Sequence, residues 1–297
     1  MIATMLITET ENGLMALQIL EKRLPAAPPA FIRQLLRKDK ILRSGQPVTI
    51  DTVLRSGDRL TLPDSARLRE LLQASQQMTV EILRENPLWV VVYKPAGMAV
   101  HRGSGHEADN LTDRVQAWLQ RQGASFRVSP AHRLDVGTSG PVLFAKGRRA
   151  ASILGQALMA GQMEKTYLTL APGCLPETGL LSSPVPAKGK WKEAATRYRV
   201  LSRNREWMLL QLDLLSGRTH QIRRQLADAG HPLAGDSRYG GPSLPGLDRP
   251  FLHCCRLIWP DAQDVVRQSV ICPLPEDLSN VLSAMGINLP AQPIEDN

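Results

Sequence analysis

From residue 81 onward the chain alternates between apolar, strand-like segments and short stretches that contain Gly or Pro. Trp89–Tyr93 is a continuous apolar run, typical of a strand that is buried on both faces. Strand patterns return at 165–172, 195–203, 207–216 and 266–274, whereas helical patterns are confined to 110–122 and 148–162. Because strands outnumber helices and neighbour one another like hairpins, we expect an α+β fold with a mixed, largely antiparallel central sheet flanked by helices.

Changes in residue composition along the chain predict two domains. Residues 1–64 have the pattern of a small basic α/β domain, and residues 65–80 are polar and helix-permissive, as expected of a linker. The larger domain is expected at 81–285. The polar, Pro-containing residues 286–297 are expected to form a mobile tail.

The small domain carries a concentrated positive charge. Apolar residues of the segment 31–43 recur at helical spacing, and Arg33, Arg37 and Lys40 are expected on another side of the same helix, with Arg43 after it. The stretches ILRSGQPVTI and VLRSGDRLTL are each expected to form a strand, a turn and a second strand. Such a helix and hairpin can follow a phosphate backbone, although a solvated surface helix would look the same. The net charge of +8, with 27 Arg against 9 Lys, also favours nucleic acid.

Several kinds of chemistry leave no trace in the sequence. There is no phosphate-binding GxxxxGK[ST] or GxGxxG motif, no HExxH or Cys/His metal spacing and no GxSxG nucleophile turn. We therefore expect neither a metal nor an organic cofactor. The four cysteines form no CxxC pair, the N-terminus has no signal-peptide pattern, and no apolar run approaches about 18 residues. These features favour a cytoplasmic protein without a membrane span.

Three segments place polar groups in apolar surroundings. In the first, HRLDVGTSG, a cation at Arg133 would keep a desolvated carboxylate at Asp135 ionised, as a nucleophile requires. The second places Tyr167 on a strand, where its ring could stack on a base. The third, SGRTHQIRR, contains Arg218, His220 and Arg223 and suits an anion at a helix start. Taken singly, a structural ion pair, a core aromatic and a capped basic helix explain them as well.

The order and spacing of these segments resemble the RluA-type pseudouridine synthase family. The shared features are KPAG at 94–97, HRLDxxTSG, KxY with its Tyr 32 residues after the Asp, SGRTHQIR, HPxxGDxxYG and FLHxxRL. The likeness runs from about residue 85 to 275. The segment 28–62, within a match of about 50 residues, in turn resembles the small RNA-binding domain named for ribosomal small-subunit protein four.

This resemblance implies an enzyme that isomerises uridine in RNA to pseudouridine with one aspartate and no cofactor. It implies that Asp135 attacks the sugar or the base, or assists a glycal intermediate, on a flipped-out nucleotide. It also implies that Tyr167 packs against that base and helps in proton transfer, and that Arg223 pairs with the aspartate, with Arg218 as the second candidate. Arg133 would fill the space left by the base, and His220 would contact RNA. We expect the partner to be structured RNA, with ribosomal RNA favoured over transfer RNA. We expect the protein to be a monomer.

One departure from the family pattern bears on activity. The family has a basic and then an acidic residue after HRLD, whereas this chain has Val136 and Gly137. That difference keeps open a non-catalytic RNA-binding or ribosome-assembly factor on the same scaffold. A glycoside hydrolase is a third hypothesis, disfavoured because Asp135 has no acidic partner in the other motifs.

Overall fold

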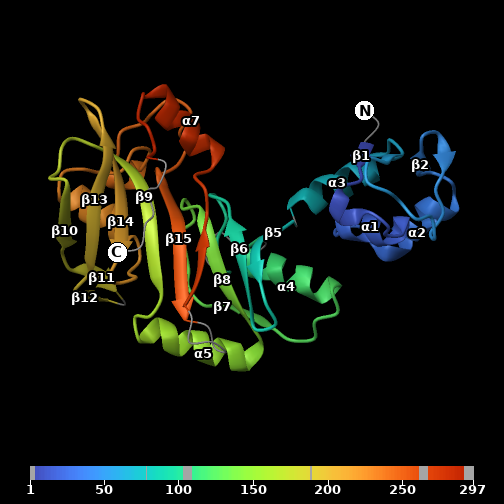
Figure 1. Ribbon diagram of the computed structural model, residues 1–297, viewed down its shortest axis with the longest axis horizontal. Helices are drawn as coiled ribbons and strands as arrows, with labels where there is room; N and C mark the ends of the chain where they lie inside the picture. Colours follow the sequence, from blue (N-terminus) through green and yellow to red (C-terminus); the bar gives the residue numbers. More distant parts are fainter. Residues whose placement is uncertain (1–3, 78, 103–108, 188, 261–266, 291–297) are drawn as a thin grey trace. The chain divides into compact units, whose positions relative to one another are not determined.

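A computed structural model describes residues 4–77, 79–102, 109–187, 189–260 and 267–290 (Figure 1). The chain divides into two compact units. Unit 1 comprises Met1–Thr79 with Trp118–Gly123, and unit 2 comprises Val80–Ala117 with Ala124–Asn297. No helix among the described residues is both long and apolar enough to span a membrane.

Unit 1 packs three helices against a small antiparallel sheet with the strand order β1-β4-β2-β3. Apolar faces of all three helices meet in one core, which includes Ile19, Leu20, Ile32, Leu36 and Leu68. The helices and strands are α1 (Ala16–Arg23), α2 (Pro29–Arg37), α3 (Ala66–Gln77), β1 (Thr4–Leu6), β2 (Leu42–Arg43), β3 (Gln46–Pro47) and β4 (Arg59–Thr61).

Two local predictions for unit 1 are wrong. Helix α2 ends at Arg37, and Asp39 adopts φ 54°, so Lys40 lies beyond the helix rather than on its basic side. The first hairpin forms as β2 and β3, but the second does not. Instead β4 pairs with β1 and β2. This pairing places Leu60, which is fully buried, in the core shared with the helices.

The segment expected to be a linker is the helix α3, whose Leu68 and Leu71 are buried in the core of unit 1. Within the expected tail, Ile287 is only 3% exposed and packs with apolar side chains of α7 (Glu276–Ala284). The last part of that tail, 291–297, lies outside the described residues.

Unit 2 is built on two antiparallel sheets, which confirms the α+β class. A six-stranded sheet has the order β10-β13-β14-β9-β15-β16, and a four-stranded sheet has the order β5-β6-β8-β7. The strands are β5 (Glu81–Glu85), β6 (Trp89–Lys94), β7 (Val128–Pro130), β8 (Gly140–Lys146), β9 (Glu164–Pro172), β10 (Thr178–Ser182), β13 (Ala195–Arg203), β14 (Trp207–Leu214), β15 (Leu252–Pro260) and β16 (Arg267–Ile271), with a separate hairpin of β11 (Val185–Ala187) and β12 (Lys190–Lys192).

The two sheets of unit 2 join where β8 approaches β15. An isolated parallel bridge links Ser139 to His253, and the hydroxyl of Ser139 lies 2.9 Å from Nδ1 of His253. The other ring nitrogen, Nε2, lies 3.0 Å from the carbonyl oxygen of Cys272. Gly140 has φ 136°, and a Cβ there would lie 2.4 Å from the carbonyl oxygen of Cys254. The TSG and FLH motifs therefore hold the two sheets at a distance that only glycine permits.

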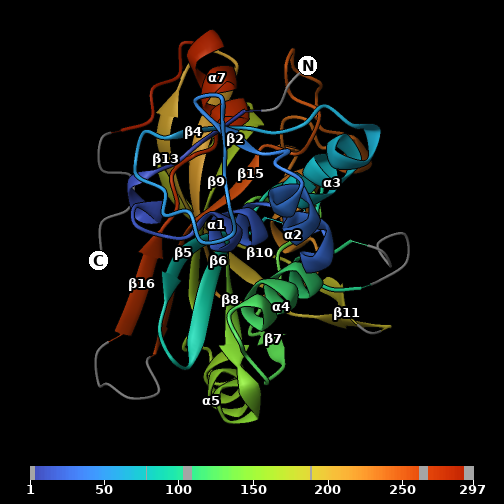
Figure 2. The same cartoon turned by 90° about the vertical axis from the view of Figure 1, so that its right-hand side faces the viewer.

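The remaining helices of unit 2 are the first part of α4 (Leu111–Arg121), which unit 2 holds up to Ala117, and α5 (Gly147–Met159), α6 (Gln221–Asp228) and α7. Figures 1 and 2 show α5 and α7 at opposite ends of β9 and β15. Helix α5 shares a core with Trp89 and Trp259, whose rings meet edge to face at 4.9 Å between centroids. Since those rings come from β6 and β15, the core spans both sheets, and the loops between the strands are held on a rigid base.

Candidate active site

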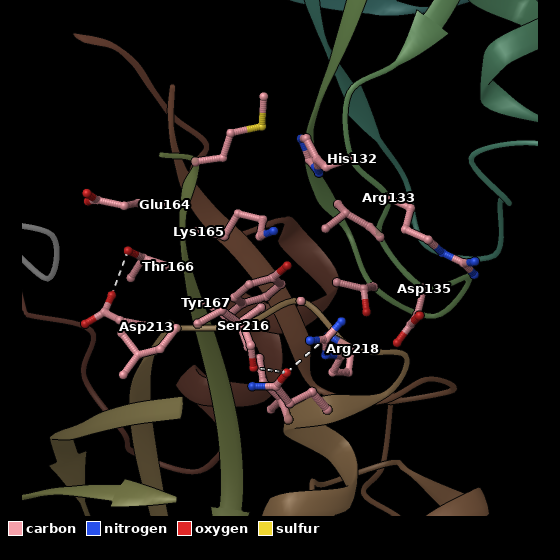
Figure 3. A pocket seen from close by; sticks show the side chains of 18 of the residues that line it. His132, Arg133, Asp135, Glu164, Lys165, Thr166, Tyr167, Asp213, Ser216 and Arg218 are labelled. Carbon is pink, nitrogen blue, oxygen red and sulfur yellow. Dashed lines mark hydrogen bonds between the residues drawn. The ribbon is translucent and has the colours of Figure 1, made fainter. Parts of the chain in front are cut away.

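A pocket of about 980 Å³ lies in unit 2 and contains the three segments singled out in the sequence (Figure 3). It is lined by the loop that follows β7, by the start of β9 and by the loop between β14 and α6. Its volume is that of a site for a small molecule or a single nucleotide. Among the predicted site residues it brings together Asp135, Tyr167, Arg223, Arg133, Arg218 and His220.

Asp135 sits in a turn before β8, with a side chain that is 18% exposed. Its carbonyl oxygen accepts a hydrogen bond from the backbone of Thr138 at 3.0 Å. The next carbonyl, that of Val136, accepts from the backbone of Gly97 at 2.8 Å and from Nζ of Lys94 at 3.2 Å. The loop that carries the carboxylate is therefore fixed to the KPAG loop through its backbone.

Lys94 is fully buried and acts as the centre of that attachment. Its ammonium donates to the carbonyls of Pro95 and Met98 as well, at 2.9 and 2.7 Å. Burial lowers the pKa of Lys94 to about 7, while the nearby Asp135 carboxylate raises it and Arg249 lowers it. We conclude that the lysine of KPAG braces the loop rather than reaching the pocket, since it is absent from the pocket wall.

This bracing explains how the loop keeps its shape with Val136 and Gly137. The Val136 side chain is 37% exposed, and the carbonyl of Gly137 accepts from Arg249 at 3.3 Å. Arg249 in turn forms a pair of hydrogen bonds with Asp277 on α7. A Cβ at position 137 would lie 3.0 Å from the ring of Pro250, which favours a small residue. Contacts to the backbone thus hold the loop without a charged side chain at position 136 or 137.

Among the ion pairs of the described residues, the one that includes Asp135 is formed with His220. Its Nε2 lies 3.8 Å from the Asp135 carboxylate, and its Nδ1 lies 2.9 Å from the hydroxyl of Tyr239. Burial lowers the pKa of His220, as do neighbouring arginines, although Asp135 acts in the opposite direction. At neutral pH the imidazole of His220 is therefore uncharged. His220 has φ 55°, a left-handed conformation that sets the ring at the start of α6.

Arg223 lines the pocket but does not pair with Asp135 in this structure. Its guanidinium makes two hydrogen bonds of 2.6 Å to the fully buried Asp236. Burial lowers the pKa of Arg223, but its hydrogen bonds to Asp236 and the negative charges of Asp236 and Asp135 more than offset this and raise it. The guanidinium also lies 5.0 Å from the ring centroid of Tyr239. The HPxxGD motif thus supplies the carboxylate that Arg223 contacts in this structure, and the pairing of Arg223 with Asp135 stays a prediction.

Tyr167 and Lys165 occupy the start of β9 on the same side of the strand (Figure 3). Tyr167 is 5% exposed, and burial raises the pKa of its phenol well above the usual value, with Cys254 and Asp135 adding to the effect. The phenol therefore stays protonated and can act only as a neutral donor or as an apolar wall. Lys165 is 9% exposed, and burial lowers its pKa.

The remaining predicted contacts divide between the units. Arg133 and Arg218 are exposed at the pocket, and Figure 3 shows the guanidinium of Arg133 directed to a different side from the Asp135 carboxylate. The structure adds further arginines to the same wall, which the sequence did not single out: Arg197, Arg199 and Arg256. The other predicted set, Arg33, Arg37, Lys40 and Arg43, lies in unit 1, where Arg33 pairs with Glu21 and Arg43 with Asp58.

Two further carboxylates in the pocket wall, Glu164 and Asp213, were not identified from the sequence. Asp213 accepts a hydrogen bond from Thr166 at 2.9 Å. Figure 3 shows Glu164 and Asp213 on the side of β9 opposite to Tyr167. Asp135 lies on the Tyr167 side, so these carboxylates do not face it across the pocket. No group of three or more His, Cys, Asp or Glu in the described part of the chain is arranged to hold a metal ion.

Comparisons with known proteins identify the family to which this chain belongs. Residues 88–228 match the family described as RNA pseudouridylate synthase. A Bacillus subtilis protein named as an uncharacterized RNA pseudouridine synthase is 31% identical over 93% of this chain and 95% of its own length. The ribosomal large subunit pseudouridine synthase D of Xanthomonas campestris is 29% identical over 86% of each chain. The solved structure of human RNA pseudouridylate synthase domain containing 4 has the same fold, with a TM-score of 0.61 and 23% identity, and covers 71% of this chain and 94% of its own.

Proposed function

The chain belongs to the RNA pseudouridine synthase family, and from this we propose that it converts uridine to pseudouridine in ribosomal RNA, with Asp135 as the reacting carboxylate. One observation carries the assignment of the site. Asp135, Tyr167 and Arg223 come from segments far apart in the sequence and line a single pocket. The family and the names of the relatives favour catalysis over a non-catalytic RNA-binding or assembly factor.

The pocket can act only on a nucleotide that has left its helix. A uridine within a stem is stacked and paired, so its anomeric carbon is out of reach of a partly buried carboxylate. In our proposal the flipped base packs against Tyr167 while its sugar meets Asp135. The exposed Arg133 and Arg218 at the pocket contact phosphates of the flanking strand.

Arg223 acts in this proposal as a positioning residue. Its two hydrogen bonds to the buried Asp236 fix the start of α6, and with it the ring of His220 beside Asp135. Because bidentate pairs of this kind are rigid, they hold the wall of the pocket before RNA arrives. Substrate binding would then find the carboxylate and the base-packing ring already placed.

Ribosomal RNA is the substrate that two features favour. The Xanthomonas campestris relative is named for the large ribosomal subunit, and unit 1 carries the exposed basic residues Arg33, Arg37 and Lys40. We assign unit 1 to RNA binding, since a large structured RNA offers phosphates beyond the target nucleotide. We further propose that the protein works as a monomer in the cytoplasm. The four cysteines are free thiols, as expected of a reducing compartment.

The proposal is tested with RNA that carries tritium at carbon five of uracil. Formation of pseudouridine releases that tritium to water, and we expect release from ribosomal RNA but not from a matched pool of transfer RNA. Asp135→Asn should abolish release while RNA binding persists. Asp213→Asn is the matched control, because it neutralises a carboxylate of the same pocket on the other side of β9.

Three results would contradict the proposal in different ways. If neither RNA pool loses tritium with the wild-type protein, the chain is a binding or assembly factor. Release that persists in Asp135→Asn would assign the reaction to another group. A free uracil or sugar product would indicate hydrolysis, the chemistry expected of a glycosidase with two carboxylates.

A further inference from the structure

Two buried lysines of unit 2 have opposite surroundings. The ammonium of Lys94 is satisfied by three carbonyl oxygens. The ammonium of Lys165, a residue that is 9% exposed, donates no hydrogen bond to any described residue and forms no ion pair with one. Its nitrogen is not among the fully buried polar atoms that lack a partner, so it is open to the pocket, where a ligand can complete its hydrogen bonds.

Lys165 points into the pocket rather than into the core. It belongs to the pocket wall, two residues before Tyr167 on β9, and Figure 3 shows both side chains on the side of the strand that faces the Asp135 loop. A Cβ added to Gly217 would lie 3.5 Å from Nζ of Lys165, so the ammonium borders the loop between β14 and α6. It is therefore enclosed between two walls of the same pocket.

The groups around Lys165 offer it no counter-charge. The thiol of Cys254 stays neutral because burial raises its pKa to about 12. Burial, together with Lys165 itself, lowers the pKa of His132 to about 3, so that ring is neutral as well. The position thus lacks an anion of its own and is suited to receive one from the ligand.

We propose, on the basis of the function proposed above, that the ammonium of Lys165 donates a hydrogen bond to a carbonyl oxygen of the flipped uracil and stabilises the base as an anion. With the sugar at Asp135 and the ring against Tyr167, the far edge of the base points toward Lys165. A backbone phosphate is the less suitable occupant, since it stays with the strand at the exposed arginines.

The chemistry of the isomerisation requires such a group. When a carboxylate oxygen of Asp135 bonds to C1′, the bond between C1′ and N1 breaks, and its electron pair enters the pyrimidine ring and spreads over N1, O2 and O4. The base turns and C5 bonds to C1′, which releases Asp135 as a carboxylate. The proton on C5 then leaves and N1 gains a proton, so that the product is neutral. A donor already aimed at one of the oxygens stabilises the negative charge at the stage where it is greatest.

The first test compares Lys165→Met with Lys190→Met, which makes the same change at an exposed position on β12. Under single-turnover conditions with tritiated RNA, Lys165→Met should lower the rate by about 100-fold or more. Its Kd for RNA should stay within about twofold of wild type, because one hydrogen bond to the ground-state base adds little to the phosphate contacts. Lys190→Met should react at the wild-type rate.

The second test uses the wild-type protein and does not depend on how the variant folds. Target uridines are replaced singly by 2-thiouridine or 4-thiouridine, because sulfur accepts hydrogen bonds weakly. We expect the wild-type rate to fall for one of the two, and Lys165→Met to show no additional loss for that same substitution. That pattern would identify the oxygen that Lys165 contacts.

The inference and the proposed function fail in separate ways. If wild type releases no tritium, the proposed function is wrong. If wild type is active and Lys165→Met is equally fast, or if both proteins lose the same factor with both thio substrates, the role of Lys165 is wrong. If the variant weakens RNA binding without slowing the bound reaction, Lys165 contacts the backbone and the base assignment fails.

Discussion

At the scale of single residues, the site depends on which polar groups are satisfied inside the protein and which are left for RNA. Arg223 has a buried partner in Asp236, and Lys94 has three carbonyls. The ion pair of Asp135 among the described residues is the 3.8 Å contact with His220, and the ammonium of Lys165 has no hydrogen bond or ion pair among them. The two groups without strong internal partners are those that we assign to the sugar and the base.

Buried histidines give a prediction on pH and stability. Burial lowers the pKa of His132 to about 3 and that of His253 to about 4, from an ordinary value of 6.5. Between pH 6.5 and 4 the unfolded chain binds protons that the native protein does not, so the free energy of unfolding should fall as the pH falls. The expected slope is up to about 1.4 kcal/mol per pH unit for each histidine. Urea unfolding followed by tryptophan fluorescence measures it.

The variant His253→Asn separates this effect from other titrations. It should lower stability at pH 7, because the contacts to Ser139 and Cys272 are altered. It should also reduce the slope between pH 6.5 and 5 by the share of one histidine. An unchanged slope would mean that His253 is not the group that resists protonation.

At the scale of helices and strands, the joint between the two sheets of unit 2 sets the geometry of the site. Asp135 lies in the loop that leads into β8, and β8 meets β15 at the Ser139–His253 bridge. Strand β15 in turn pairs with β9, which carries Tyr167. The distance between the Asp135 carboxylate and the Tyr167 ring therefore depends on how closely β8 and β15 approach.

Gly140→Ala tests that dependence. Its Cβ would lie 2.4 Å from the carbonyl oxygen of Cys254 at φ 136°, so the strands must separate. We expect a loss of about 3 kcal/mol or more in the free energy of unfolding, with loss of activity. Gly155→Ala is the control, since Gly155 lies within α5 with open space around its Cβ position. It should stabilise the protein by up to about 1 kcal/mol; equal stability of the two variants would refute the account of the joint.

The elements that periodicity could predict are largely those that form, and the failures have physical causes. The buried strand at Trp89, the helices near 111–121 and 147–159 and the strand at 195–203 are present. The second hairpin of unit 1 is not, because its strand is recruited by β1 and β2. Pairing between distant strands is a tertiary choice that a local pattern does not encode.

The candidate site shows the same limit. Ordered motifs indicated Asp135, Tyr167 and Arg223, and all three line one pocket. The same motifs did not indicate that Arg223 would bond to Asp236, or that Lys165 would lack a partner. Both depend on side-chain neighbours that are brought together only when β9, α6 and the loop after it pack.

At the scale of the whole molecule, the protein combines a basic unit 1 with the pocket of unit 2, in a chain whose net charge is +8. Neutralising Arg33, Arg37 and Lys40 with glutamine should weaken RNA binding. It should also reduce the slope of log K against log salt by up to about 2 to 3, since each lost phosphate contact removes about 0.7 to 0.9. Filter binding at several salt concentrations measures this slope.

The matched control removes three positive charges from unit 2, through glutamine at Arg148, Arg149 and Arg205. These positions are exposed and lie outside the pocket wall. The salt slope should stay close to that of wild type. Equal losses in the two triple variants would mean that net charge, and not unit 1, determines RNA affinity.

The most direct test of the central claim maps pseudouridine in the ribosomal RNA of cells that lack this protein. Expression of the wild-type chain should restore modification at one or a few defined uridines, whereas Asp135→Asn at the same protein level should restore none. Restoration by Asp135→Asn would show that the chain acts without its carboxylate, and would contradict the account.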